Sequence, residues 1–253
     1  MKLTLSVLAV LILIWVPPAR CGQITVSPAS ISLKGTAGQA TTQTFKVVNL
    51  TDGALKFSVD ISDVQVKDGR RNFIPVDQSA VSLASMSTPA LTSFELGPGE
   101  QQLVPVTFVL PQRTTTRAIA VFFRAQPKQA VEGPRVQLNL GVVVDFSTSD
   151  EVDLRLPTPE ITPPTARANA VITEQMSNEG PEPANVRGVA AFLDEGGKIV
   201  GKASFEHKRL LPGEHDVLHA EFAGALSPGH YRVLCTLEYA GRTVTKATEL
   251  IVP

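Results

Sequence analysis

Apolar and polar residues alternate along most of this chain, and few stretches follow the helical period of about 3.6 residues. In LKFSVDI the residues Leu55, Phe57, Val59 and Ile61 share one face, and VQLNLGVVV repeats the pattern over 136–144. Successive side chains of a strand point to opposite faces of a sheet, so a period of two indicates half-buried strands. The alternation therefore predicts an all-β fold.

The strand-like segments form two groups, and the first group ends near residue 146. We expect its strands at 24–33, 43–49, 55–66, 80–84, 101–110, 117–126 and 135–146. Turn sequences such as Gly97-Pro98-Gly99 separate them. Short strands at this spacing are typical of an antiparallel sandwich, so we expect an immunoglobulin-like domain over 23–150.

A proline-rich stretch separates the two groups. RLPTPEITPPT favours stiff, extended backbone, so we predict a linker over 151–165. Alternation resumes in segments such as ANVRGVAAFL and RTVTKATELIV, which predicts a second immunoglobulin-like β-sandwich over 166–253. A leucine-led Pro-Gly-Glu turn lies late in each group, at 96–100 and 211–214, as expected for related domains.

Residues 1–22 are predicted to be a cleaved secretory signal peptide. Lys2 precedes an apolar run of about 14 residues that ends in two prolines, whereas a membrane span needs about 20 apolar residues. Ala19 and Cys21 are the small residues that suit cleavage before Gly22. We therefore expect export across the inner membrane, to the periplasm or the cell surface, and no transmembrane anchor after cleavage.

The two cysteines bear on attachment and stability. Cys21 would suit a lipidated N-terminus, but Arg20 stands where lipoprotein signals carry a small residue, so lipidation is the less favoured alternative. Signal cleavage leaves Cys235 without a cysteine partner in the chain. In YRVLCTLEY, Cys235 shares a face with Tyr231 and Val233, so we expect it to pack as a small buried hydrophobe.

Charge and motifs argue against several classes of function. Loss of Lys2 and Arg20 with the signal peptide reduces the 23 basic residues to 21, against 24 acidic ones, for a net charge of −3. This balance does not suit a nucleic-acid partner. The sequence has no phosphate loop, Rossmann glycine pattern, hydrolase elbow or zinc-protease motif. We therefore expect no enzyme, no catalytic residue and no cofactor.

The sequence also contains candidate metal ligands and one glycosylation sequon. His215 and His219 lie on a predicted strand, where their spacing spans about 13 Å and prevents joint chelation of one ion. The acidic residues of 150–153 lack the spacing of a calcium loop, so we expect a solvated charged segment and no metal site. Asn49-Leu50-Thr51 matches a glycosylation sequon before a turn, and an exposed acceptor is expected there.

The segments FELGPGEQQLVPVTFVLP and RTTTRAIAVFFRAQP together resemble the periplasmic chaperones of fimbrial assembly by the chaperone–usher route. A strand, a Pro-Gly-Glu turn, a glutamine-bearing strand, a Leu-Pro stop and an arginine-led apolar strand follow that family's order. The resemblance covers residues 24–146, and the two-sandwich layout extends it to the mature chain. It implies an exported, non-enzymatic chaperone with fimbrial subunits and an usher as partners.

In that family the last strand of the first domain lends alternating apolar side chains to an incomplete subunit, completing the subunit's sheet by strand addition. The resemblance assigns this role here to VQLNLGVVV, with Val136, Leu138, Leu140 and Val142 as candidate partner-binding residues. The alternative interpretation is that Leu138, Leu140 and Val142 fill the core of their own domain. The two interpretations predict opposite exposures for these side chains.

The sequence departs from the family at its basic anchor. The family binds the subunit's C-terminal carboxylate with two basic residues in the interdomain cleft, one on the first strand and one on the last. Here the first strand has no basic residue before Lys34, and the last has none after Arg135. Arg117 and Arg135 are the candidates left for this role. The competing hypothesis is a cell-envelope or surface module, binding or structural, with two immunoglobulin-like domains.

Overall fold

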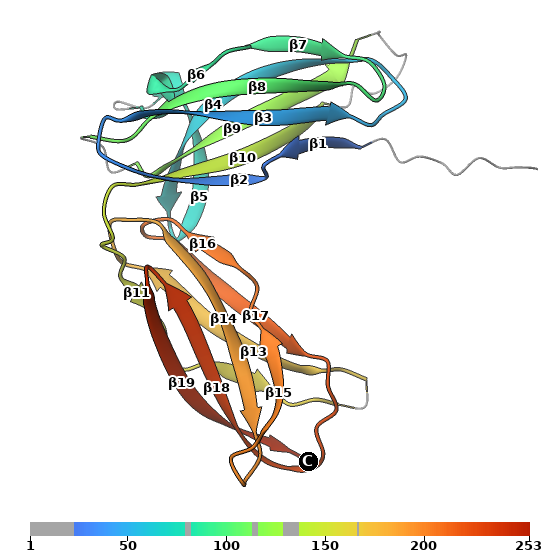
Figure 1. The fold of residues 1–253 in the computed structure, drawn as a ribbon, viewed down its shortest axis with the longest axis vertical. Coiled ribbons are helices and arrows are strands. Elements are labelled where there is room, and N and C mark those ends of the chain that lie inside the picture. Colours follow the sequence, from blue (N-terminus) through green and yellow to red (C-terminus); the bar gives the residue numbers. More distant parts are fainter. Residues whose placement is uncertain (1–22, 79–81, 113–115, 129–136, 166) are drawn as a thin grey trace, which may run out of the picture.

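The computed structural model describes residues 23–253 except 79–81, 113–115, 129–136 and 166. Figure 1 shows two β-sandwiches that meet at an angle, the first across the top of the view and the second running down from it. The predicted all-β class with two β-sandwich domains is confirmed. The predicted signal peptide, 1–22, lies outside the described residues.

The first sandwich consists of two sheets. One has the order β1-β3-β8-β6, with strands β1 (Ile24–Ser27), β3 (Ala40–Asn49), β8 (Gln101–Val109) and β6 (Thr88–Pro89). The other has the order β2-β10-β9-β4-β5, with β7 also paired to β4; its strands are β2 (Ser30–Lys34), β10 (Leu138–Ser147), β9 (Ala118–Pro127), β4 (Leu55–Lys67), β5 (Arg70–Pro75) and β7 (Ser93–Leu96). Two 3-10 helices, η1 (Val76–Gln78) and η2 (Ala84–Met86), lie between β5 and β6.

The second sandwich also has two sheets. In one, β13 (Ala170–Asn178) pairs with β11 (Leu154–Arg155), β12 (Glu160–Thr162) and β17 (His215–Phe222). The other has the order β15-β14-β18-β19, with β16 also paired to β14; its strands are β15 (Ile199–Ser204), β14 (Ala184–Leu193), β18 (Gly229–Tyr239), β19 (Arg242–Val252) and β16 (Lys208–Leu210). Because β11 and β12 lie within 151–165, part of the expected linker is paired into this sandwich.

The first predicted strand, 24–33, is divided in the structure. Pro28 has no N–H to donate to a ladder, and the chain changes sheets at this point. On one side β1 pairs antiparallel with β3, and on the other β2 pairs parallel with β10. The expectation of purely antiparallel pairing is therefore wrong for β2 and β10.

The predicted strand at 80–84 is wrong over its described residues, because Ala84 begins the helix η2. The buried carboxylate of Asp63 on β4 accepts a hydrogen bond from the Ala84 N–H at 2.8 Å, which favours the helical turn. Strand β5 was not predicted. Its sequence RRNFIP has little apolar alternation, and it forms by pairing with the end of β4 across the Asp68-Gly69 turn.

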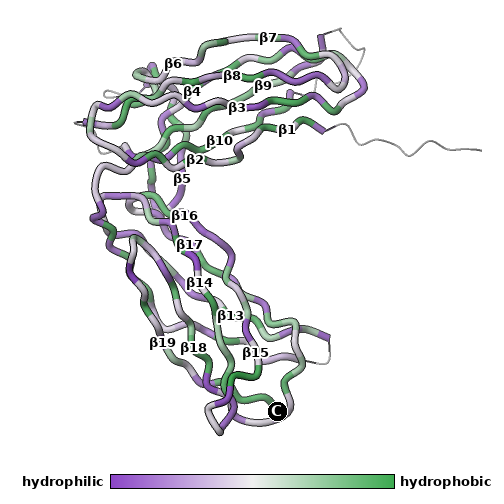
Figure 2. The backbone as a smooth tube through the Cα atoms, viewed as in Figure 1, coloured by the Kyte–Doolittle hydropathy of each residue, from purple (hydrophilic) through white to green (hydrophobic). Residues whose placement is uncertain are grey.

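Each sandwich has its own apolar core, built from the alternating residues of its facing sheets. Apolar and polar residues alternate along the strands of both sandwiches (Figure 2). The largest fully buried side chains of the first core are Phe45, Phe57, Phe108, Phe123 and Phe146. The prediction for Cys235 is confirmed, since it is buried in the second core, and burial raises the pKa of its thiol to about 12.

The predicted exposed sequon is wrong, because Asn49 is fully buried at the end of β3. Its Nδ2 donates to the carbonyl oxygens of Gly53 at 2.8 Å and Leu96 at 3.1 Å. Its Oδ1 accepts from the Thr51 N–H at 3.0 Å, and its own carbonyl accepts from the Gly99 N–H at 2.7 Å. The asparagine thus holds the Pro-Gly-Glu turn against the end of β3.

The second sandwich repeats this corner. Asn178 is fully buried at the end of β13, and its Nδ2 donates to the Leu210 carbonyl at 3.2 Å. Its carbonyl accepts from the Gly213 N–H at 2.7 Å, and its N–H donates to the Glu214 carbonyl at 3.0 Å. The equivalent corners strengthen the relation between the domains that the two Pro-Gly-Glu turns suggested.

Candidate functional site

The candidate site is the outer edge of β10 in the first sandwich. Strand β9 pairs with Leu138–Asp145 on one side of β10, whereas β2 covers only Val143–Ser147 on the other. Within the described part of the chain, no strand pairs with Leu138–Val142 on the side of β2. This segment therefore presents an open sheet edge, which can accept another strand.

The predicted residues of this strand differ in exposure. Leu138 is 42% exposed, Leu140 is half-buried against the first core, and Val142 is only 2% exposed. These side chains lie on the core-facing side of the sheet, as Val144 does. Along this side, the side chains become more exposed toward the start of the strand. Val142 fills the core of its own domain, while Leu138 offers apolar surface at the open edge. Val136 lies outside the described residues.

The two arginines expected near the cleft are Arg117 and Arg135. Arg135 lies outside the described residues, and Arg117 directly precedes β9. The Nε of Arg117 is 3.4 Å from Oε2 of Glu182, a buried acid of the second sandwich. Glu182 also accepts a hydrogen bond from the Thr148 hydroxyl at 2.9 Å. Arg117 thus takes part in the contact between the sandwiches.

A second ion pair between the sandwiches lies where β2 pairs with β10. Nη1 of Arg209, on β16, is 2.6 Å from Oδ1 of Asp145 on β10. The same guanidinium donates to the Ile31 carbonyl at 3.2 Å, and so also holds β2. Burial raises the pKa of the Asp145 carboxyl, and the Arg209 charge and the Ser32 hydroxyl oppose this change.

The hairpin β4–β5 forms a third contact between the sandwiches, and β5 reaches the upper end of the second sandwich in Figure 1. Nε and Nη2 of Arg71 donate to the two carboxylate oxygens of Glu214 at 2.7 and 2.9 Å. Glu214 also accepts from the Leu211 N–H at 2.8 Å, within the Pro-Gly-Glu turn. Leu211 itself packs on Val64 and Ala118 of the first sandwich.

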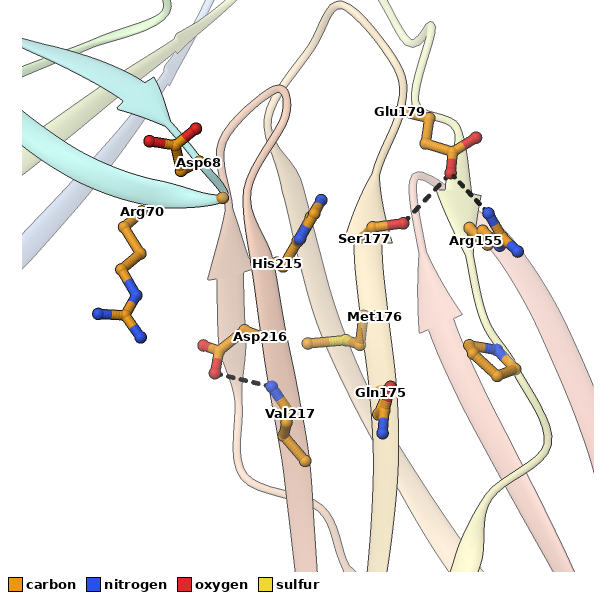
Figure 3. Close-up of a pocket in the computed structure, with 12 residues that line it drawn as sticks. Asp68, Arg70, Arg155, Gln175, Met176, Ser177, Glu179, His215, Asp216 and Val217 are labelled. Atoms are coloured by element: carbon orange, nitrogen blue, oxygen red, sulfur yellow. Dashed lines mark hydrogen bonds and ion pairs between the residues drawn. The ribbon is translucent and has the colours of Figure 1, made fainter.

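A cavity of about 610 Å³ lies where the Asp68-Gly69 turn meets β13 and β17. Figure 3 shows Arg155 and Ser177 directed at Glu179 on one side of it, with His215 near the turn. Its lining carries both signs of charge, so it favours no single class of ligand. Among the described residues, no cluster of three or more His, Cys, Asp or Glu side chains is arranged to hold a metal ion.

The sheet that contains β10 carries an aromatic pair on its outer face, away from the core of the first sandwich. This pair was not predicted from the sequence. Phe122 on β9 and Phe73 on β5 contact edge to face, with ring centroids 5.3 Å apart. Phe73 is 48% exposed. Phe122 is paired in register with Gly141, in the middle of the open edge. This arrangement depends on the pairing of strands far apart in sequence, so alternation alone gives no signal for it.

Comparison with solved structures finds fimbrial chaperones that are similar to this chain. No family model matches the chain, and no curated protein matches its sequence. The class 5 fimbriae chaperone CfaA is similar at 13% identity over 91% of this chain and 99% of its own, with a TM-score of 0.46. The chaperone YadV is similar at 10% identity over 90% of this chain and 99% of its own, with a TM-score of 0.44.

A third similar structure is the CsuC–CsuE complex of a chaperone with a tip adhesion subunit, from the archaic Csu pili of Acinetobacter baumannii. The identity is 10% over 90% of this chain and 97% of the matched chain, with a TM-score of 0.42. These proteins are of the kind that the sequence resembles, and the similarity concerns the fold. In the described part of this chain, no helix has the length and apolar character of a membrane span.

Proposed function

We propose that the mature chain acts in the periplasm as a chaperone-like protein that binds an incomplete protein subunit by β-strand addition at the edge of β10. The observation that carries this proposal is the open edge of Leu138–Val142, where the apolar side chain of Leu138 is exposed. The proposed partners are fimbrial subunits and an usher. The proposal needs no catalytic step.

Binding would use both the backbone and the side chains of the edge. The edge offers main-chain groups to a partner strand, and Leu138 and Leu140 offer apolar surface on one face. Full burial of a leucine side chain is worth about 1.5–3 kcal/mol, so two partly exposed leucines can contribute measurably to affinity. Strand β2 limits the added strand to the first half of β10, because it occupies the second half.

In the proposed complex, Arg117 does not bind the subunit's C-terminal carboxylate as the basic anchor of the resembled family does. Arg117 lies beside Glu182, and Arg209 lies beside Asp145, so both guanidiniums serve the contact between the sandwiches. Arg135 stays a candidate for that role. We therefore expect main-chain pairing and apolar contacts to carry most of the binding.

A second candidate function is that of a two-domain binding or structural module of the cell envelope. The observation in its favour is the set of ion pairs that join the sandwiches, Asp145–Arg209, Arg117–Glu182 and Arg71–Glu214, since they use charges that a cleft ligand would need. Such a module would bind through another surface, and the edge of β10 would be dispensable.

Site-specific cross-linking distinguishes the two functions. Cys235 is buried, so Leu138→Cys introduces an accessible thiol at the open edge. The matched control is Leu103→Cys, because Leu103 is 54% exposed on β8 in the opposite sheet. Each purified variant would be labelled at its thiol with benzophenone maleimide, mixed with small fimbrial subunits and illuminated. The excited benzophenone inserts into a nearby C–H bond, and the adducts would be identified by mass spectrometry.

We expect position 138 to form an adduct with an apolar strand of one such subunit and position 103 to form none. The adduct should be lost when Leu140→Asp is added to a chain whose thermal melting shows that it still folds. Equal adducts from both positions, or an adduct unaffected by Leu140→Asp, would favour the envelope module instead.

A further inference from the structure

Gly141 leaves a gap in the side chains of the open edge, and the ring of Phe122 fills part of it. Leu140 and Val142 face the core, so Gly141 lies on the outer face of the sheet. A Cβ atom at Gly141 would lie 2.8 Å from Cε1 of Phe122 and 3.1 Å from its Cδ1. The ring of Phe122 therefore extends over the backbone of β10 toward its free side.

The apolar surface continues from this ring across the sheet. Phe73 contacts Phe122 edge to face and is 48% exposed. The Arg124 guanidinium also lies over the Phe122 ring, 5.9 Å from its centroid, and Oδ2 of Asp60 lies 3.4 Å from Nε of Arg124. We call Phe73, Phe122 and the backbone of Gly141 the aromatic face. It lies beside the open edge, on the side opposite the core.

We propose that the strand bound at β10 places a bulky apolar side chain opposite Gly141, in contact with the aromatic face. This inference rests on the proposed function and adds the character of the partner strand. Paired residues of adjacent strands lie on the same face with Cβ atoms about 5 Å apart. Gly141 has no side chain, so the partner's residue there meets the Phe122 ring across the glycine.

The two faces of β10 together define the partner strand. Its residues beside Leu138 and Leu140 meet apolar surface on the core side, and its residue opposite Gly141 meets the aromatic face on the other. The partner strand is therefore apolar on both faces at this point, as are strands from the interior of a folded protein. A half-exposed strand with one polar face fits less well.

A second copy of this chain is a poorer occupant of the same edge. The outer face of β10 carries Asn139, Gly141 and Val143 in succession. Antiparallel pairing of two such strands about Gly141 would set glycine against glycine and leave the aromatic face uncovered. The edge thus favours a different polypeptide.

The test uses the mature chain and three labelled synthetic peptides. Each peptide alternates Val on one face with Thr on the other, and its central Thr-face residue is Phe, Ser or Lys. Binding is measured by fluorescence anisotropy. We expect the Phe peptide to bind about 3- to 10-fold more tightly than the Ser peptide, the range of a well-placed aromatic contact. The Lys peptide should bind no better than the Ser peptide.

The variant Phe122→Ala should reduce the Phe-to-Ser preference to about one. Phe122→Leu provides a second variant if the alanine chain does not fold, and it should lower the preference partly. The matched control is Phe94→Ala, because Phe94 is a partly buried phenylalanine that stacks on Phe57 on the far side of β4. This control should keep the full preference.

The failures of the two proposals are distinguishable. Peptides that bind the edge without preference, or a preference that persists in Phe122→Ala, would overturn the role of the aromatic face and leave strand addition standing. If no peptide binds, or if Leu138→Asp binds all three as the wild type does, both proposals fail. A dimer of the peptide-free chain that Leu138→Asp dissociates would assign the edge to a second copy and overturn the inference.

Discussion

Asn49 ends β3 with no exposed surface, and its side-chain amide bonds to the carbonyl oxygens of Gly53 and Leu96. Asn49→Ala leaves these buried acceptors without their donor, so we expect a loss of about 2–4 kcal/mol in the free energy of unfolding. Urea denaturation measures it. Asn72→Ala, on the exposed part of β5, is the control and should change stability by less than about 0.5 kcal/mol. A similar small loss for Asn49→Ala would contradict the role of the corner.

Glu174 on β13 predicts a pH dependence of stability. It is fully buried, with Oε1 3.2 Å from Nζ of Lys246. Burial raises the pKa of its carboxyl above the ordinary value of 4.5, and Lys246 opposes this change. Above pH 4.5 the native state therefore holds the proton more tightly than the unfolded chain, so this group's contribution to stability falls as pH rises through the raised pKa.

The measurement compares wild type with Glu174→Gln between about pH 4.5 and about pH 7. The free energy of unfolding of the wild type, minus that of the variant, should be larger at the lower pH. Tyrosine fluorescence follows the transition, because Tyr231 and Tyr239 both lie in the second sandwich. Glu249→Gln, at an exposed position of β19, should give a smaller pH-dependent difference. A difference that grows with pH would contradict the assigned direction.

At the scale of elements, β10 combines a core strand with an open edge. Val142→Asp places a charge in the core and should cost about 3 kcal/mol or more, whereas Leu138→Asp lies at an exposed position and should cost less than about 1 kcal/mol. Thermal melting of the two single variants measures the contrast. Equal destabilisation would mean that Leu138 also fills the core, which would remove the basis of the proposed edge.

Alternation predicted those strands whose buried face is continuous. The strands β14 and β19 have the predicted bounds, 184–193 and 242–252, because each alternates over its whole length. It failed at β5, where pairing with β4 supplies what the sequence pattern lacks, and at Ala84, where a carboxylate from β4 stabilises a helical turn. Local pattern predicts a strand only where burial follows that pattern.

The candidate site was predictable in part. The apolar face of β10 is visible in VQLNLGVVV, but its division between core and open edge depends on where β2 ends. The partner of Arg117 is a glutamate of the other sandwich, and the Phe122–Gly141 pair comes from strand register. Both depend on contacts between distant parts of the chain, so neither could be inferred from local sequence.

At the scale of the whole molecule, Arg71 and Glu214 connect the two sandwiches. Arg71→Ala leaves the mostly buried Glu214 carboxylate without its guanidinium, so we expect a coupling energy of about 1–3 kcal/mol in a double-mutant cycle with Glu214→Ala. Denaturation of the full chain measures it. Glu214→Ala should be the more harmful single change, because Glu214 also accepts from the Leu211 N–H.

Small-angle X-ray scattering provides the independent measurement for this contact. Arg71→Ala should broaden the distribution of distances between the sandwiches, and Arg187→Ala, which removes an exposed ion pair with Glu238 inside the second sandwich, should not. An unchanged scattering curve for Arg71→Ala together with no coupling energy would show that the pair does not hold the sandwiches together.

The parallel pair of β2 and β10 sets the order in which the first sandwich can be finished. Strand β2 is made near the start of the chain and β10 near the end of the domain, and a chain emerging N-terminus first presents β2 long before its neighbour exists. Closing so long a loop is among the slower steps of folding. The edge proposed to receive a partner is thus among the last parts of its domain to be synthesised. A newly emerging chain therefore cannot present that edge until the other strands of the sandwich have been synthesised.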